Sequence, residues 1–223
     1  MIFRNSISFL KKKINSLYLN SNIYDRRISL YEDSVLTYKP SPSLLDCLIK
    51  FKKKKINIEN YSMDEIWDKN LLKKDHNNLN SFFWLFSLDL KSSKKETQNI
   101  ILKWIEENYN FNSKSWEIDI LAKRIIAWIS NAKLSYEGGG VVYRNKFNNI
   151  IKKQINHLIN EIEKDNWADN KMIGCAAIIL VGLSYQDKDN YLNTGLSLLK
   201  KIIKISFDNK GFPKSRKNFE SIY

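Results

Sequence analysis

Residues that break regular structure are scarce along this chain. Its 223 residues include only seven Gly and three Pro, whereas folds built of many short strands need turn residues at frequent intervals. Apolar residues make up 43% of the chain and aromatic residues 13%, which excludes a wholly disordered protein. The composition therefore favours long helices around a packed core, in one domain or at most two.

From residue 76 onward, apolar residues recur with the period of an α-helix. The period is clear over 143–162, whereas 116–134 is apolar on nearly all sides, which predicts a helix buried by several neighbours. Asn166 and Asp189 are expected to cap two of the later helices. We expect helices over 80–90, 94–109, 116–134, 143–162, 167–185 and 191–207, with a shorter one over 43–52.

Residues 1–40 show no sustained period, because their Tyr residues lie among Asn, Ser and charged residues. We therefore expect an irregular segment over 1–40 and a helical domain over 41–223. Helices of this length joined by short loops favour antiparallel neighbours. The predicted fold class is all-α, an array of antiparallel helical hairpins whose spacing resembles a solenoid or toroid, with no sequence repeat to identify a repeat family.

The net charge of +13 has two interpretations. The chain is rich in Lys, Ile and Asn, residues with A- and T-rich codons, so Lys can simply accumulate on solvated faces. Alternatively, the charge attracts nucleic acid, an acidic polysaccharide or a membrane surface. Charge alone does not choose between these interpretations, but the sequence contains no recognisable nucleic-acid-binding motif, so nucleic acid is not the expected partner.

Several classes of site and segment are excluded. Two Cys, at positions 47 and 175, do not form a disulfide framework, and with two His they show no metal-ligand spacing. The glycines at 138–140 lack the Lys-Ser/Thr of a phosphate-binding loop. No window of 18 apolar residues occurs, so we expect no membrane span. Lys residues at 11–13 follow an apolar stretch, which is the reverse of the order in a signal peptide. The compartment therefore stays open: either the cytoplasm, or the periplasm through another export route.

Three residues within the predicted helices have two interpretations each. Arg124 is either a structural ion-pair partner or a guanidinium that binds a carboxylate or sulfate through two hydrogen bonds. Trp128, like most of the Trp residues, is either core or a face on which a sugar ring stacks. His157 is either a satisfied histidine at a helix contact or a group in a groove. A nucleophilic pair of His157 with Cys175 is not expected, because Cys175 lies in an apolar run.

Residues 208–223 differ from the rest, since they are polar and include a Gly and a Pro. They are either a frayed tail or part of a site in which Ser215, Arg216, Asn218 and Tyr223 lie close along the chain. An Asn amide can donate a hydrogen bond to a substrate carboxylate, and a Tyr hydroxyl can transfer a proton.

Five segments resemble the heparinase II/III family of polysaccharide lyases and follow that family's order. Residues 116–130, WEIDILAKRIIAWIS, are similar to a family signature of Trp, a Leu-Ala-Arg-Arg-like run and Ile-Ala-Trp. The other four are 81–90 (SFFWLFSLDL), 154–158 (QINHL), 170–185 (NKMIGCAAIILVGLSY) and 211–218 (GFPKSRKN). The likeness covers roughly residues 60–220. The last segment departs from the family pattern, because Lys217 separates Arg216 from Asn218, Phe219 replaces Pro, and the usual His before Ser-Arg is absent.

The resemblance implies an incomplete (α/α) toroid that in the family precedes a β-sandwich domain, which this chain lacks. Family members cleave acidic polysaccharides containing uronic acid by β-elimination, a step that needs no metal or organic cofactor. Asn218 would then neutralise the substrate carboxylate, with the base and acid expected beyond Tyr223, so the chain alone is expected to be inactive or incomplete. The implied substrate contacts are Ser215, Arg216, Arg124, Trp128 and His157. The alternatives are a non-catalytic basic helical module that binds polyanions, either nucleic acid or acidic polysaccharide, and a degraded fragment with no activity.

Overall fold

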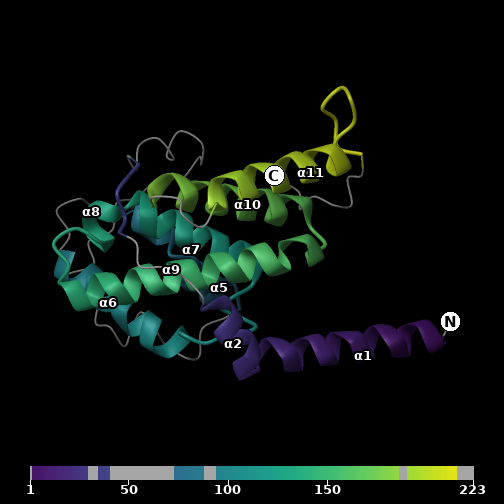
Figure 1. Ribbon diagram of the computed structural model, residues 1–223, viewed down its shortest axis with the longest axis horizontal. Helices are drawn as coiled ribbons and strands as arrows, with labels where there is room; N and C mark the ends of the chain where they lie inside the picture. Colours follow the sequence, from purple (N-terminus) through teal and green to yellow (C-terminus); the bar gives the residue numbers. More distant parts are fainter. Residues whose placement is uncertain (1, 30–34, 41–72, 88–93, 186–189, 215–223) are drawn as a thin grey trace.

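The computed structural model is built from helices (Figure 1) and describes residues 2–29, 35–40, 73–87, 94–185 and 190–214. Every regular element in these ranges is helical, which confirms the all-α prediction. No helix of the described residues is both long enough and apolar enough to span a bilayer. The α-helices are α1 (Ile2–Leu19), α2 (Asn22–Ile28), α5 (Lys73–Ser81), α6 (Lys94–Asn108), α7 (Ile118–Ser130), α8 (Ala132–Ser135), α9 (Val141–Glu161), α10 (Ala168–Ser184) and α11 (Tyr191–Ser206), with 3-10 helices η2 (Phe83–Ser87) and η3 (Ile162–Lys164).

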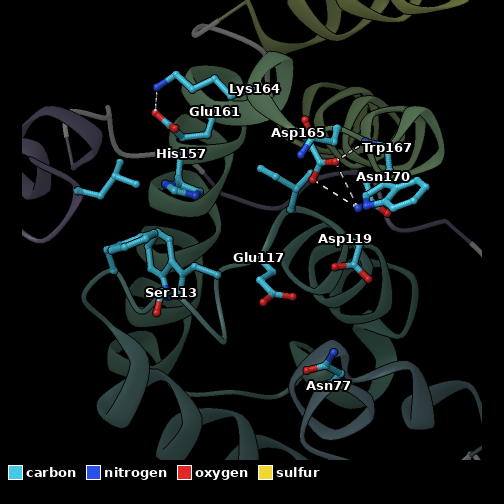
Figure 2. Close-up of a pocket in the computed structure, with 15 residues that line it drawn as sticks. Asn77, Ser113, Glu117, Asp119, His157, Glu161, Lys164, Asp165, Trp167 and Asn170 are labelled. Atoms are coloured by element: carbon cyan, nitrogen blue, oxygen red, sulfur yellow. Dashed lines mark hydrogen bonds and ion pairs between the residues drawn. The ribbon is translucent and has the colours of Figure 1, made fainter. Parts of the chain in front are cut away.

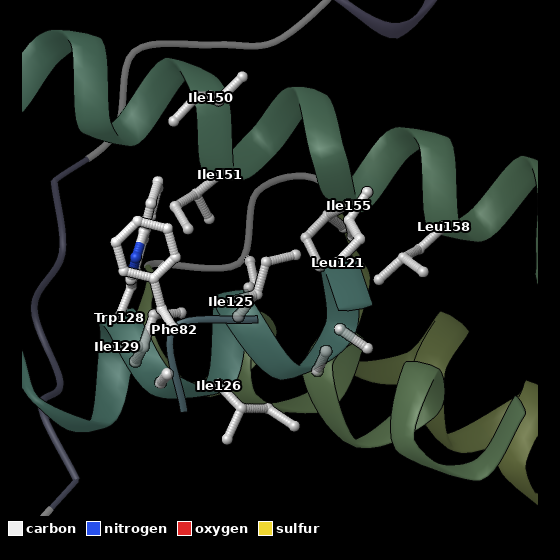
Figure 3. Close-up of a cluster of buried hydrophobic side chains, with 14 of the residues drawn as sticks. Phe82, Leu121, Ile125, Ile126, Trp128, Ile129, Ile150, Ile151, Ile155 and Leu158 are labelled. Atoms are coloured by element: carbon white, nitrogen blue, oxygen red, sulfur yellow. The ribbon is translucent and has the colours of Figure 1, made fainter. Parts of the chain in front are cut away.

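Helix α7 lies at the centre of the bundle. All of its residues except Asp119 and Lys123 are buried, and it packs against α5, α9 and α10. Figure 3 shows α9 lying across α7, with apolar side chains from both helices, such as Ile125 and Ile151, filling the space between them. The prediction of a helix buried on several sides is confirmed, because a helix that is apolar all round is stable only inside a core.

Four predicted helices form where their periodicity placed them. Helices α6, α9, α10 and α11 begin and end within two residues of the predicted bounds. Two others are broken. The segment 80–90 turns at Phe82, which adopts a φ of 55° between α5 and η2. The segment 116–134 breaks at Asn131, whose side chain donates a hydrogen bond to the Ala127 carbonyl (2.9 Å) and so closes α7. The predicted helix over 43–52 lies outside the described residues.

The N-terminal segment is not irregular as we expected. Residues 1–40 contain α1, α2 and an extended stretch over 35–40. Helix α2 begins at an N-cap, where the Ser21 hydroxyl accepts a hydrogen bond from the Tyr24 backbone N–H (3.2 Å). Helix α1 has 18 residues, but its apolar residues are interleaved with Asn, Ser and Lys, which obscures its period in the sequence.

This N-terminal segment also packs on the helices that follow it. The Lys153 ammonium on α9 is buried and lies 2.6 Å from the Asp25 carboxylate on α2. Burial lowers the pKa of Lys153, an effect that the hydrogen bond and the charge of Asp25 oppose. The Thr37 backbone N–H donates to the Ser184 carbonyl at the end of α10 (2.8 Å). The expected boundary at residue 40 therefore does not separate these elements from the helical bundle.

Helices α10 and α11 approach closely because two glycines face the partner helix. A Cβ atom at Gly182 would lie 2.4 Å from the backbone nitrogen of Leu192, and one at Gly195 would lie 3.0 Å from that of Ile179. Figure 1 shows α9, α10 and α11 running back and forth beside one another.

Arg124 joins four segments inside the bundle. Its Nη1 donates hydrogen bonds to the carbonyls of Asn80 (2.8 Å) and Ser115 (2.9 Å), and its Nε donates to the Gln154 side chain (3.2 Å). Its guanidinium carbon lies 4.0 Å from the centre of the Trp104 ring. The Asn80 carbonyl is one of the last four of α5, so Arg124 also satisfies the end of that helix.

The guanidinium of Arg124 is buried without an acidic partner among the described residues. Burial lowers its pKa well below the usual value. Carbonyl dipoles and the face of Trp104 take the place of a carboxylate, and these interactions are strong in a medium of low dielectric constant. Arg124 is therefore a structural brace of the core.

Replacing Arg124 with Met should destabilise the protein by about 2–4 kcal/mol. The substitution keeps most of the buried volume but leaves two carbonyls and an amide oxygen without their donor. Urea unfolding at neutral pH measures the loss, and Arg26→Met, at an exposed position of α2, is the matched control, expected to change stability by less than about 0.5 kcal/mol. Equal stability of the two variants would contradict this prediction, because the free-energy cost of burying the charge would then equal the stabilisation by these hydrogen bonds.

A methyl group at Gly182 should separate α10 from α11. Gly182→Ala is expected to lower stability by about 2 kcal/mol or more, because the clash is with backbone rather than with a mobile side chain. Gly140→Ala is the control, since a Cβ atom at Gly140 meets nothing within 4 Å. Thermal melts of both variants measure the change in stability. A Gly182→Ala variant as stable as the wild type would contradict the close contact between the two helices.

Candidate functional site

A cavity of about 660 Å³ opens where α7 begins, α9 ends and α10 begins. Its size falls within the roughly 300–1,000 Å³ that is usual for small-molecule sites. Figure 2 shows side chains from these helix ends surrounding the open space. The polar lining residues are Asn77, Ser113, Glu117, Asp119, Glu161, Lys164, Asp165, Asn166 and Asn170, and the other lining residues are Leu19, Phe111, Trp116, Ile118, His157 and Trp167.

The cavity is acidic although the chain as a whole is strongly basic. Its lining includes the carboxylates of Glu117, Asp119, Glu161 and Asp165, against the ammonium of Lys164. Lys164 lies 2.7 Å from Glu161, and Lys123 lies 3.1 Å from Asp119, so two of these four carboxylates are paired with ammonium groups. Within the described part of the chain, no group of three or more His, Cys, Asp or Glu residues is placed to hold a metal ion. The lining therefore offers hydrogen-bond acceptors to a ligand.

The carboxylate of Asp165 lies beside the start of α10. Asp165 accepts a hydrogen bond from the Trp167 backbone N–H (2.7 Å), and it also contacts the Asn170 amide nitrogen (3.3 Å). Trp167 is the N-cap of α10 and its side chain makes no capping hydrogen bond, so the capping role that we expected for Asn166 is wrong. The negative charge of Asp165 beside the helix start would repel an anionic ligand there.

Trp167 supplies an aromatic face beside these acceptors. Its side chain is 38% exposed and lines the cavity, whereas Trp116 in the same wall is buried. The apolar face of an indole suits the C–H face of a sugar ring, and carboxylate and amide oxygens accept hydrogen bonds from its hydroxyls. The combination of an exposed Trp with carboxylates and amides therefore fits a neutral, hydroxyl-rich ligand.

His157 forms part of the inner wall. Its Nδ1 lies 2.8 Å from the Tyr24 hydroxyl. Burial, together with the smaller effect of the charge of Lys164, lowers the pKa of His157 to about 3. The imidazole is therefore neutral at neutral pH, and its Nδ1 is occupied by Tyr24. His157 is a satisfied histidine that shapes the cavity.

Arg124 and Trp128 do not line this cavity. Both side chains are wholly buried, and Trp128 packs against the rings of Phe82, Trp104 and Phe147. Because a substrate contact needs an exposed group, we assign Arg124 and Trp128 to the core in place of the substrate contacts expected from the sequence.

The remaining predicted residues divide into two groups. Cys175 is buried, and burial raises the pKa of its thiol to about 11, which agrees with an inert core residue. Ser215, Arg216 and Asn218 lie outside the described residues, so their roles stay predictions.

Sequence reasoning missed the residues that make the cavity acidic. Glu117, Asp119 and Asn170 carried no assignment, and Trp167 was grouped with core aromatics. A signal was present, because each of two helix starts combines a Trp with acidic residues, in WEID at 116–119 and in DNWADN at 165–170. Only the fold shows that these two helix starts lie at one cavity.

No family model, curated protein or solved structure matches this chain.

Protonation of His157 should make stability depend on pH. Its folded pKa of about 3 lies below the usual 6.5, so between these values the unfolded chain binds a proton that the folded chain excludes. Stability contributed by the neutral ring is present above pH 6.5 and falls as the pH drops, by about 3 kcal/mol between pH 7 and pH 4.

Urea unfolding across this range measures the effect of His157. His157→Phe should flatten the pH dependence, although it also loses the hydrogen bonds of the ring. The other histidine provides the control, because His76→Gln should keep the full dependence. Parallel pH profiles for the wild type and His157→Phe would contradict this account.

Proposed function

We propose that this chain is a saccharide-binding helical domain of the heparinase II/III lineage of polysaccharide lyases. The observation that carries the binding part of the proposal is the cavity with its exposed Trp167 beside carboxylates and amides. Such a lining recognises hydroxyl groups and the apolar face of a sugar ring.

The lineage rests on the five ordered segments of the sequence. Three of them fall on helices that meet around the cavity: 116–130 on α7, 154–158 on α9 and 170–185 on α10. The antiparallel run of α9, α10 and α11 supports an incomplete (α/α) toroid. In this proposal the whole enzyme would need a β-sandwich domain, and its substrate would be an acidic polysaccharide cleaved by β-elimination.

Because the lining is acidic, the proposal places saccharide binding and the elimination reaction at different sites. A uronate carboxylate in the cavity would meet four carboxylates, of which Lys123 and Lys164 pair two, so the cavity would take the neutral, hydroxyl-bearing part of the glycan. The carboxylate of the reacting sugar would instead be held by Arg216 and Ser215 and neutralised by Asn218. No proton transfer is assigned to His157, because the ring is buried and Tyr24 occupies its Nδ1.

The second candidate is a non-catalytic module that binds polyanions through its basic surface. The net charge of +13 favours it. The cavity argues against it, since a polyanion would be repelled from the acidic lining and would have to bind elsewhere on the chain. A polyanion-binding module would also bind in a strongly salt-dependent manner, because it releases counterions.

Titration of the chain with neutral and uronate oligosaccharides, followed by calorimetry, tests the proposed function. We expect neutral oligosaccharides to bind more tightly than uronate oligosaccharides of equal length. Trp167→Ala should weaken binding about tenfold, equivalent to about 1.4 kcal/mol, through loss of the aromatic face. Glu117→Gln should narrow the preference for neutral ligands, because it removes one negative charge from the lining.

Matched controls are available on exposed positions away from the cavity. Phe212→Ala and Glu107→Gln alter exposed side chains that do not line it, and both should bind as the wild type does. Equal affinity of the wild type and Trp167→Ala for the oligosaccharides would contradict the proposal that this cavity binds saccharide. A preference for polyanions that falls steeply with salt would favour the second candidate.

A further inference from the structure

Helix α1 extends away from the rest of the bundle, as Figure 1 shows for the purple helix that ends at the N-terminus. It is anchored near its C-terminal end. Tyr18 and Leu19 pack against the core, and the Arg27 guanidinium donates a hydrogen bond to the Tyr18 hydroxyl (3.2 Å). Residues 10–17 are not among the described side chains that pack in the core, so their surface needs its own explanation.

The exposed part of α1 carries an apolar face. Leu10, Ile14 and Leu17 are 56%, 64% and 67% exposed. Their spacing of four and then three residues places them on one side of the helix. Three large aliphatic side chains aligned in this way differ from the single exposed apolar residues that are normal on a protein surface.

Positive charges flank this apolar face. Lys11, Lys12 and Lys13 are all exposed. At 100° per residue, Lys11 and Lys13 lie on opposite sides of the face, about 100° and 60° from Leu10. The sequence has no carboxylate before Asp25, so no acidic residue balances them within α1.

We infer that α1 lies in the surface of an anionic lipid membrane. Leu10, Ile14 and Leu17 would enter the boundary between headgroups and acyl chains, while the ammonium groups of Lys11 and Lys13 would reach lipid phosphates on either side. The helix lies on the membrane and does not cross it, because Lys residues occupy its middle.

The charge pattern of α1 favours an anionic membrane over a second copy of the chain and over a nucleic acid. A second copy of α1 would bring two apolar faces together, but it would also bring six Lys side chains together without a carboxylate. A nucleic acid would satisfy the charges and leave the apolar face in water. An anionic membrane satisfies both features at once.

Co-sedimentation of the full chain with lipid vesicles tests this inference. We expect binding to vesicles of phosphatidylglycerol with phosphatidylcholine, and little binding to phosphatidylcholine alone. Replacing Lys11, Lys12 and Lys13 together with Gln should weaken binding at least tenfold, since each basic residue near an anionic surface contributes about fivefold. Leu10→Asn with Ile14→Asn should also weaken binding at least tenfold, because it removes the face that enters the lipid.

The control is a pair of equivalent changes on another helix. Ile203→Asn with Ile205→Asn alters exposed isoleucines of α11 and should leave vesicle binding unchanged, and circular dichroism melts confirm that each variant folds. The inference is overturned if no vesicle binds, if neutral vesicles bind equally well, or if the α1 and α11 variants lose binding alike. It is also overturned if light scattering shows a dimer that the α1 apolar variant dissociates, because a second copy would then cover the face.

Discussion

The buried guanidinium of Arg124 is the interaction on which the arrangement of the helices depends. A cation removed from water needs partners, and those of Nε, Nη1 and the guanidinium face come from the end of α5, the residues before α7, the middle of α9 and the ring of Trp104 on α6. Nη2 is buried without a hydrogen-bond partner among the described residues. Each partner must hold its position for the charge to be tolerated. The surrounding apolar residues supply most of the stabilisation, and Arg124 determines how the segments are placed relative to one another.

That placement produces the cavity. Arg124 bonds the carbonyl of Ser115 immediately before α7, and α7 then begins at the cavity wall. On the opposite side, Lys153 and His157 of α9 hold α2 through Asp25 and Tyr24. The hydrogen bonds of His157 thus close the inner wall and also attach the N-terminal helices to the bundle, so one neutral ring serves both the cavity and the fold.

The electrostatics of the chain are unevenly distributed, and this distribution bears on function. The cavity gathers carboxylates, whereas the N-terminal helix has only positive charges. A single interpretation of the net charge as attraction to polyanions overlooks this division. A neutral saccharide in the cavity and an anionic surface against α1 would use the two regions separately, and Leu19 at the end of α1 lines the cavity and joins them.

The spacing of apolar residues was sufficient to predict the helical class and the bounds of α6, α9, α10 and α11. A helix that buries one face repeats its apolar residues about every 3.6 positions, and this repeat can be seen in the sequence. It was insufficient for α1 and α2, whose apolar residues lie among polar and charged ones. It was also insufficient for Phe82 and Asn131, where one residue ends a helix within an apolar run. The core assignment of most Trp residues could also be predicted from their apolar neighbours.

The candidate site depended on tertiary structure. Sequence suggested that Arg124 and His157 either bind a ligand or support the structure, and only their burial and hydrogen-bond partners decided for support. The acidic cavity could not be predicted, because Glu117 and Asp165 lie far apart along the chain and meet only when α7 and α10 pack together. The sequence by itself determined that the chain forms amphipathic and buried helices, since helix formation depends on near neighbours. Tertiary structure alone decided which helix ends converge, because that depends on contacts between residues distant in sequence.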